Sequence, residues 1–264
     1  MDINQGAKES LQLIRKGLSA RDLLVIATNF RRIQLEHELR NRVKGKIVDG
    51  PFKGCIHPAE AHSSSLCPKL LGTYEKEISR DLLDLAVGKD CFIDIGCAEG
   101  YYTTGIGVVT DIPLILGVDV NEKALECAQK SSELNGISGK TQFFPDLLEA
   151  VRLVKGKSLV MIDVDGSEID VINRLFSSLN AVQALSVDLI IETDRGSDGK
   201  SNADEIVDTL RSRNFVVEKV IRQSVADRFS SLSKKLSTSY LDMFIYGLEG
   251  RPLDQCWLIA KPLS

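Results

Sequence analysis

The chain has 264 residues, of which 43% are hydrophobic and 27% are charged, and its formal net charge is −4. This is enough apolar sequence to bury a large core in one domain with extensions. A pI near 5.5 argues against nucleic acid as the main partner, because its phosphates attract basic surfaces.

The chain contains no apolar run long enough to span a bilayer, and its N-terminus is too polar for a secretory signal. Its six cysteines stand at irregular spacings, which is typical of a reduced protein with small buried thiols rather than of a disulfide framework. We therefore expect a cytoplasmic protein.

Residues 1–45 are expected to be helical, because apolar side chains recur at helical spacing at Leu23, Ile26, Phe30 and Ile33, beside a charged face. The interpretation we favour is a helix packed on its own domain. A helix that covers the active site, or that pairs two chains into a homodimer, would have the same pattern.

A loop rich in Gly, Pro and Ser follows, over residues 45–72. It carries four side chains that bind zinc in other proteins, Cys55, His57, His62 and Cys67. Their spacing matches no closed C-x-x-C pair, so we favour a connecting or substrate-facing loop with no metal.

A helix is predicted to start at Lys69, to run past Arg80, and to lead into the central strand. Tyr74 and Glu75 precede that strand and are expected to line a nucleotide site, although Glu75 could simply favour a first helical turn. We place the domain boundary here, with a helical extension and loop over 1–68 and the main domain over 69–264.

The central stretch, residues 91–102, reads CFIDIGCAEGYY. An apolar run breaks into a turn bounded by Gly96 and Gly100, and a helical segment follows. This predicts a buried strand, a tight loop and a helix N-terminus, the arrangement with which an α/β sheet holds a ligand. Glycine lets the backbone take positive φ and approach that ligand closely.

The motif differs from the dinucleotide fingerprint, because G-x-x-x-G replaces G-x-G-x-x-G and acids stand beside the loop. Such acids suit a ligand with an ammonium group and a ribose, and S-adenosylmethionine (SAM) has both. The residues expected to contact it here are Asp94, Gly96, Cys97, Ala98, Glu99, Gly100 and Tyr101.

A second strand, residues 114–119, ends in Asp119, which with the adjacent Val120 is expected to contact the ribose hydroxyls. Asn121 is predicted to cap a helix over 122–134.

A third strand, residues 141–144, is followed by Asp146 and Leu147, also expected in the cofactor site. Asp146 is placed to accept the adenine amino proton, but aspartate is also a common helix N-cap.

The fourth strand, residues 158–163, ends in the densest acidic point of the core, Asp163, Asp165 and Glu168. Crowded carboxylates repel one another, so one of them can have a raised pKa and serve as a base, or the group can hold a cation. We favour a catalytic base, with Glu168 ahead of Asp165. The structural alternative is a turn at Asp165 and a helix start at Glu168.

A fifth strand over 187–193, a helix over 203–213 and a sixth strand over 215–221 complete the alternation. The last strand, 256–260, has no crossover helix before it, which predicts an antiparallel hairpin. The intervening insertion, about 222–255, is expected to form a substrate lid.

Three stretches, DIGCAEGYYTTGIG, GVDVNEKALECAQKSSELNG and MIDVDGSEIDVI, resemble the class I SAM-dependent methyltransferases, and the third is similar to the FkbM-like branch. Where that branch usually reads D-V-E-G-A-E, this chain has Asp165 and Ser167 in place of the first Glu and the Ala. The resemblance covers about residues 69–195 and the final strand. It implies a Rossmann-like α/β fold whose seven-stranded, mostly parallel sheet has a reversed last strand.

The resemblance also implies methyl transfer to a hydroxyl of a sugar or polyketide. We expect the acceptor to be a sugar, glycan or other small natural product, and a carboxylate to be the base. Two alternatives share the sequence pattern. One is a nicotinamide-dependent oxidoreductase, against which the missing G-x-G-x-x-G and the reversed last strand count, and the other is a non-catalytic SAM-binding protein.

Overall fold

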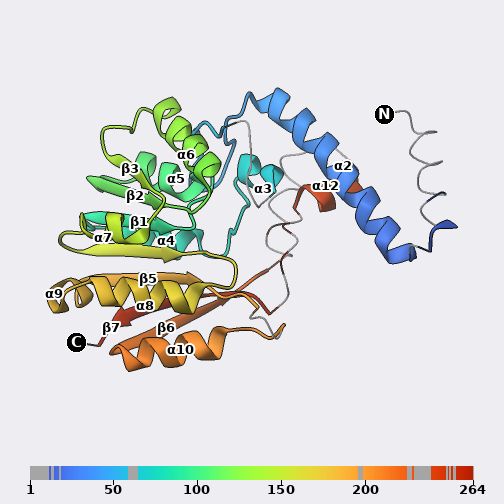
Figure 1. Ribbon diagram of the computed structural model, residues 1–264. Coiled ribbons are helices and arrows are strands. Elements are labelled where there is room, and N and C mark those ends of the chain that lie inside the picture. Colours follow the sequence, from blue (N-terminus) through green and yellow to red (C-terminus); the bar gives the residue numbers. More distant parts are fainter. Residues whose placement is uncertain are drawn as a thin grey trace.

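The computed structural model describes residues 12, 15–17, 19–58, 65–195, 199–224, 228, 239–247, 249, 251 and 254–263. Its centre is one seven-stranded sheet with the strand order β3-β2-β1-β4-β5-β7-β6 (Figure 1). The strands are β1 (Cys91–Ile95), β2 (Leu114–Val118), β3 (Thr141–Phe144), β4 (Ser158–Ile162), β5 (Val187–Glu192), β6 (Phe215–Arg222) and β7 (Cys256–Pro262).

The helices are α2 (Ala20–Val43), α3 (Leu66–Leu71), α4 (Ser79–Ala86), α5 (Tyr101–Val109), α6 (Glu122–Leu134), α7 (Leu147–Val151), α8 (Glu168–Ser178), α9 (Ala181–Ala184), α10 (Ala203–Ser212) and α12 (Tyr240–Tyr246). Of the helices in the described ranges, none is both long and apolar enough to cross a membrane.

The sheet explains why the central strands are apolar throughout. β1 lies between β2 and β4 and runs parallel to both, and all five of its residues are buried. Strands covered on both faces need apolar side chains pointing both ways, so their sequences show no alternation.

Helices cover both faces of the sheet. Side chains from α7, α8 and α10 pack against one face in a cluster that includes Ile93 and Val160. Side chains from α4 and α5 pack against the other face in a cluster that includes Phe92 and Met161. The strand ends are left free of these layers, and the candidate site lies there.

The reversed last strand is confirmed. β7 runs antiparallel to both β5 and β6 and lies between them. This strand order, with an inserted antiparallel β7, is that of the class I methyltransferase fold, as the sequence resemblance implied. Within the predicted lid, the structure describes residues 222–224, 228, 239–247, 249, 251 and 254–255, of which Tyr240–Tyr246 form α12.

The N-terminal helix α2 packs on its own chain, but not through the predicted stripe. Leu35 and Leu39 are buried in a cluster with residues of α3 and α12, and α2 lies beside both helices (Figure 1). Phe30 and Ile33 of the predicted stripe are 38% and 59% exposed. The pattern identified a helix correctly and its buried face wrongly, since the packed residues lie on the opposite side.

The predicted helix from Lys69 onward is interrupted. α3 ends at Gly72, whose φ is 69°, and α4 begins only at Ser79. A Cβ at Gly72 would lie 1.7 Å from the carbonyl oxygen of Asp49, so this chain crossing requires glycine and ends the helix. Tyr74 and Glu75 therefore lie in a turn, where Glu75 has a φ of 43°.

Candidate active site

A cavity of about 910 Å3 opens at the carboxyl ends of β1, β2 and β4. In the strand order, β1 and β4 are neighbours, and the chain winds outward from them in opposite directions. This is the topological switch point, the place where open α/β sheets bind their ligands. The residues around β7 add Glu249, Arg251 and Gln255 to the cavity wall.

The glycine loop forms the floor of the cavity. Gly96, with a φ of 88°, has no room for a side chain, because a Cβ would lie 1.7 Å from the carbonyl oxygen of Asp163. The amides of Gly96 and Cys97 donate to the carbonyl oxygen of Val118 at 2.8 and 3.0 Å. Gly96, Cys97, Ala98 and Tyr101, which are among the residues expected at the cofactor, all line the cavity.

Asp119 fixes this loop and also faces the cavity. Its Oδ2 accepts a hydrogen bond from the Ala98 amide at 2.8 Å, and its Oδ1 accepts one from the Asn121 amide at 2.8 Å. Each carboxylate oxygen has a second lone pair, so Asp119 can still accept from two ligand hydroxyls. Val120 beside it also lines the cavity and is 90% exposed.

Asp94 lies at the bottom of the cavity and is buried. Its Oδ2 accepts hydrogen bonds from the amide and the hydroxyl of Thr103, at 3.0 and 2.7 Å. Burial outweighs these bonds and raises the pKa of Asp94 to about 7. Asp94 thus holds the start of α5 in place while it contributes a carboxyl group to the cavity.

Four residues predicted to bind the cofactor do not line the cavity, Glu75, Glu99, Gly100 and Asp146. The Glu99 carboxylate is fully buried, contacts the Lys69 ammonium, and lies 3.3 Å from His57 Nε2. Burial alone would raise the pKa of Glu99, but Lys69 and His57 outweigh it and leave that pKa below its usual range. Gly100 serves instead as the N-cap of α5, with a φ of 81°.

The structure places Glu168, the residue favoured as the base, away from the cavity. Glu168 is 1% exposed and is absent from the cavity wall. Its Oε1 accepts from the Gly166 amide at 2.9 Å, and its Oε2 accepts from the Asn202 amide group at 2.6 Å. Oε1 therefore fixes the turn before α8, and Oε2 ties the start of α8 to Asn202.

Asp165, the other candidate in this loop, does line the cavity. It is exposed at the rim and has a φ of 47°, followed by Gly166 with a φ of 93°. Two consecutive left-handed residues turn the chain so that Asp165 faces the cavity and Glu168 faces away from it. Asp163, at the end of β4, lines the cavity from deeper inside.

Of the two roles expected for Asp146, the structure shows the helix N-cap. It is the N-cap of α7, where its Oδ1 accepts from the Leu148 amide at 3.0 Å and from Arg174 at 2.7 Å. Its neighbours Pro145 and Leu147 line the cavity, whereas Asp146 does not.

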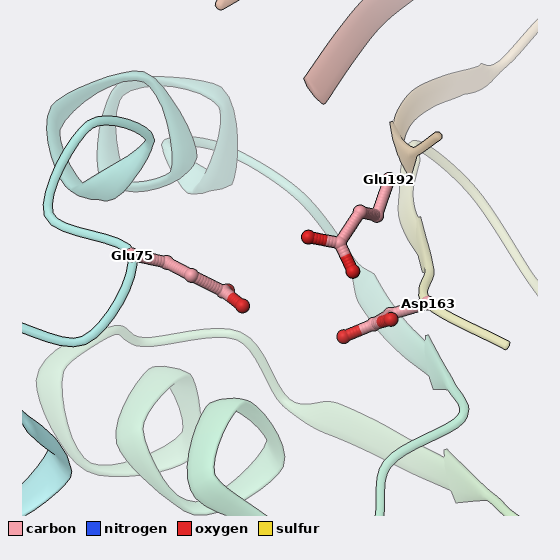
Figure 2. Close-up of side chains that lie close together, drawn as sticks. All are labelled: Glu75, Asp163 and Glu192. Atoms are coloured by element: carbon pink, nitrogen blue, oxygen red, sulfur yellow. The ribbon is translucent and has the colours of Figure 1, made fainter. Parts of the chain in front are cut away.

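Three carboxylates from distant parts of the chain meet beside the cavity. Glu75, Asp163 and Glu192 point toward one another from the turn before α4 and from the ends of β4 and β5 (Figure 2). Their oxygens lie within 4.8 Å of one another, a spacing that a metal ion could bridge. The guanidinium of Arg251, however, contacts both Glu75 and Glu192 and provides a counter-charge.

Crowding and burial change the acidity of this group. Burial, and then the charge of Asp165, raise the pKa of Asp163 to about 7. Burial and the charge of Asp163 raise the pKa of Glu75 well above its ordinary value. A carboxyl with a pKa near 7 can take up or release a proton at neutral pH, which is what a general base requires.

Sequence reasoning missed several residues of the cavity wall, among them Lys69, Glu192, Glu249 and Arg251. Glu192 ends a strand, as Asp119 does, and the same rule could have identified it. Lys69 and Arg251 carry no local signal, because their positions depend on long-range packing.

The four side chains of the loop that could in principle bind zinc are separated where the structure describes them. Cys55 is buried in the cluster with α4 and α5, whereas Cys67 is buried in the cluster with α2. His57 approaches Glu99 rather than either thiol. His62 lies outside the described residues, and within those residues no potential metal-binding group includes Cys55, His57 or Cys67.

No protein-family profile and no curated protein sequence matches this chain. Several solved structures are similar in fold. A ribosomal protein L11 methylase from Lactobacillus delbrueckii subsp. bulgaricus is 15% identical with a TM-score of 0.48, and the match covers 72% of this chain and 79% of that one.

Two more structures match similarly. TrmK from M. capricolum, solved with S-adenosyl-homocysteine (SAH), is 17% identical with a TM-score of 0.45, and the match covers 71% of each chain. StiE O-MT is 14% identical with a TM-score of 0.48, and the match covers 73% of this chain and 76% of that one. These matches are too remote to carry an argument about chemistry, and the fold assignment follows from the strand order and the reversed β7.

Proposed function

We propose that the protein is a SAM-dependent methyltransferase that methylates a hydroxyl group on a sugar, glycan or other small natural product, in the manner of the FkbM-like branch. The observation that carries this proposal is the pairing of Asp119 with the glycine loop across the switch-point cavity. Asp119 is suited to the ribose hydroxyls. Gly96 and Ala98 let the backbone lie close beneath the ligand.

The cavity also favours SAM over a nicotinamide dinucleotide. The dinucleotide fingerprint G-x-G-x-x-G, whose loop approaches the pyrophosphate, is replaced here by G-x-x-x-G, and Asp94 adds a carboxyl group to the cavity. Asp119 does not discriminate, because an acid that binds a ribose suits either cofactor. The net charge of −4 argues against an acceptor that carries many phosphates, such as nucleic acid. An uncharged hydroxyl acceptor and a cytoplasmic location are parts of the proposal.

Each residue has a role in this proposal. Asp119 and the loop over Gly96–Ala98 hold and orient the cofactor, which supplies an electrophilic methyl group. Asp163 takes the proton of the acceptor hydroxyl, since its pKa is about 7 and it faces the cavity. Asp165 at the rim orients the acceptor, and Glu249 and Arg251 close the cavity from the β7 side. Positioning and electrostatics account for the rate.

The test is turnover with SAM carrying a labelled methyl group, on a panel of sugars, glycosides and phenolic natural products. We expect labelled ether product with at least one hydroxyl acceptor and a rate roughly 10²–10⁴ lower in Asp163→Asn. Asp208→Asn, a matched change at an exposed site on α10, is the control and should leave the rate unchanged. SAM binding without transfer to any acceptor would favour the non-catalytic alternative, and reduction of NAD+ by a sugar would favour the oxidoreductase.

A further inference from the structure

Exposed apolar side chains gather on two helices that lie side by side, α2 and α12 (Figure 1). These two helices carry eight of the 21 large hydrophobic side chains that are exposed in the described part of the chain. We call the eight the apolar group: Leu24, Val25, Ile26, Phe30, Ile33, Tyr240, Leu241 and Phe244. Scattered exposed apolar residues are ordinary, but a concentration of them on neighbouring elements marks an interaction surface.

The N-terminal part of the chain is basic, although the chain as a whole is acidic. Of the 33 Lys and Arg and the 37 Asp and Glu, residues 1–46 contain ten and five, which gives this segment a net charge of +5. The other residues contain 23 and 32, a net charge of −9. An anionic surface therefore attracts the segment that contains α2 and repels the rest of the chain, which favours one orientation of approach.

The acids of α2 are already engaged within the chain. Asp22 belongs to the N-terminal capping box, Glu36 pairs with Arg32 at 2.9 Å, and Glu38 lies 3.6 Å from Arg31. Most bases of this segment, in contrast, form no salt bridge within the residues that the structure describes. These unpaired bases are Arg15, Lys16, Arg21, Arg40, Arg42, Lys44 and Lys46.

Apolar side chains beside unpaired bases are the composition with which a helix lies in a membrane interface. Lipid headgroups supply the negative charge, and the acyl boundary beneath them accepts the apolar side chains. The aromatic rings of Tyr240 and Phe244 also suit the headgroup level. A second copy of the chain fits less well, because it would bring two segments of net charge +5 together.

We propose that α2 and α12 dock on an anionic phospholipid surface, with the apolar group at the acyl boundary and the unpaired bases among the headgroups. The binding is peripheral, since α2 lies in the surface and does not cross it. The inference goes beyond the proposed function and does not depend on it, because docking needs neither the cofactor nor an acceptor.

The docking helices are adjacent to elements that border the cavity. Side chains of α3 pack in one cluster with Leu35 and Leu39 of α2, and Lys69 of α3 lines the cavity. Glu249 and Arg251, which follow α12 in the chain, line the cavity as well. Docking therefore places the lipid surface on elements that are connected to the candidate active site.

The test is co-sedimentation of the purified full chain with lipid vesicles. One set of vesicles is made of phosphatidylcholine alone, and the other of equal parts of phosphatidylcholine and phosphatidylglycerol. We expect binding to the mixed vesicles to be at least about tenfold tighter than to the neutral ones, and to weaken as salt is added. A chain with a net charge of −4 has no general attraction to anionic lipid, so this preference requires the basic segment.

Variants of both kinds of side chain locate the surface. Each base near an anionic membrane contributes about fivefold in affinity, so Arg15→Ala/Lys16→Ala/Arg21→Ala should weaken binding on the order of 100-fold. Its matched control changes three exposed bases elsewhere, Lys123→Ala/Lys130→Ala/Lys155→Ala, and should bind like wild type.

Leu24→Ser/Ile33→Ser removes two apolar side chains that are 68% and 59% exposed. It should weaken binding roughly tenfold or more. Its matched control is Val182→Ser/Leu185→Ser, at two sites that are 76% and 64% exposed, and should bind like wild type. Circular dichroism establishes that each variant is folded, which is expected because every substituted side chain is exposed.

Three results would overturn the inference. One is wild-type protein that binds the mixed vesicles no better than the neutral ones, a result that needs no variant. Another is loss of binding in the charge variant alone, with Leu24→Ser/Ile33→Ser unaffected, because the apolar group would then not enter the lipid. The third is a dimer in sedimentation velocity without lipid that Leu24→Ser/Ile33→Ser dissociates, which would assign the apolar group to a second copy. SAM binding, measured separately, tests the proposed function and is expected to be the same in all these variants.

Discussion

Gly96→Ala is the most informative single change to the glycine loop. The new Cβ would lie 1.7 Å from the carbonyl oxygen of Asp163, at a backbone φ of 88°. The neighbour is backbone rather than a flexible side chain, so either the loop or the end of β4 has to move. That movement would displace Asp163 and the loop amides together.

The cost can be worked out from two contributions. A non-glycine residue in this backbone region costs roughly 1–3 kcal/mol, and overpacking of a buried contact adds roughly 1–3 kcal/mol. We expect the free energy of unfolding to fall by about 2–6 kcal/mol, which for a chain of this size lowers Tm by roughly 5–20 °C. SAM affinity should fall by at least about tenfold, because the loop no longer lies flat beneath the ligand.

The control is Gly139→Ala, where a new Cβ meets nothing within 4 Å. Thermal melts and SAM titrations of both variants form the assay. Gly139→Ala should retain wild-type SAM affinity and a Tm within a few degrees. A Gly96→Ala protein with unchanged Tm and unchanged SAM affinity would refute the close approach of the loop to β4 on which the site is built.

The other predictions concern the acids and the thiols. Asp119→Ala should weaken SAM roughly ten- to a hundredfold in a titration, because a charge-assisted hydrogen bond is lost, and unchanged affinity would remove this residue from the site. Glu168→Gln should lower Tm but leave kcat close to wild type in the presence of SAM. Asp163→Asn should lower kcat but should not lower Tm. Equal effects of the two variants on Tm and kcat would contradict their different placement. Asp94 has a pKa of about 7 in the folded protein, far above that of an unfolded aspartate, so the folded state binds more protons between pH 4 and 7. Lowering the pH from 8 to 6 should therefore raise the Tm of the ligand-free protein, and Asp94→Asn should reduce that change, whereas a Tm that rises with pH would contradict the sign. Elemental analysis of protein purified without chelator should find no stoichiometric zinc, and one zinc per chain, lost in Cys55→Ser, would overturn that expectation.

Sequence patterns predicted the central sheet well, because its strands are local apolar runs. The third strand and the helix that follows Asn121 have the predicted bounds, 141–144 and 122–134. The helix is bounded by local chemistry, because the side chain of Asn121 accepts hydrogen bonds from two amides at its start and Gly136 turns the chain just after its end. Residues at strand ends, such as Asp119, were placed in the cavity for the same reason.

Predictions failed where one backbone turn or one distant partner decided the direction of a side chain. Glu168 and Asp165 are three residues apart, and only the left-handed pair at Asp165 and Gly166 determines which of them faces the cavity. Glu99 was expected at the cofactor, but its carboxylate contacts the ammonium of Lys69, which lies 30 residues earlier in the chain. No pattern within either segment contains that information.

The acidic group beside the cavity shows the same limit at longer range. Glu75, Asp163 and Glu192 meet because three separate elements end at one place, and Arg251 reaches them from the far end of the chain. A sequence rule for strand ends identifies two of these positions. The other two depend on the turn that follows Gly72 and on how the chain approaches β7.

The central claim is that the switch-point cavity is a SAM site. The most direct measurement is calorimetric titration of the purified protein with SAM and, in parallel, with NAD+. The account predicts saturable binding of one SAM per chain, abolished or strongly weakened in Gly96→Ala, and no detectable binding of NAD+. Saturable NAD+ binding with no response to SAM would contradict it.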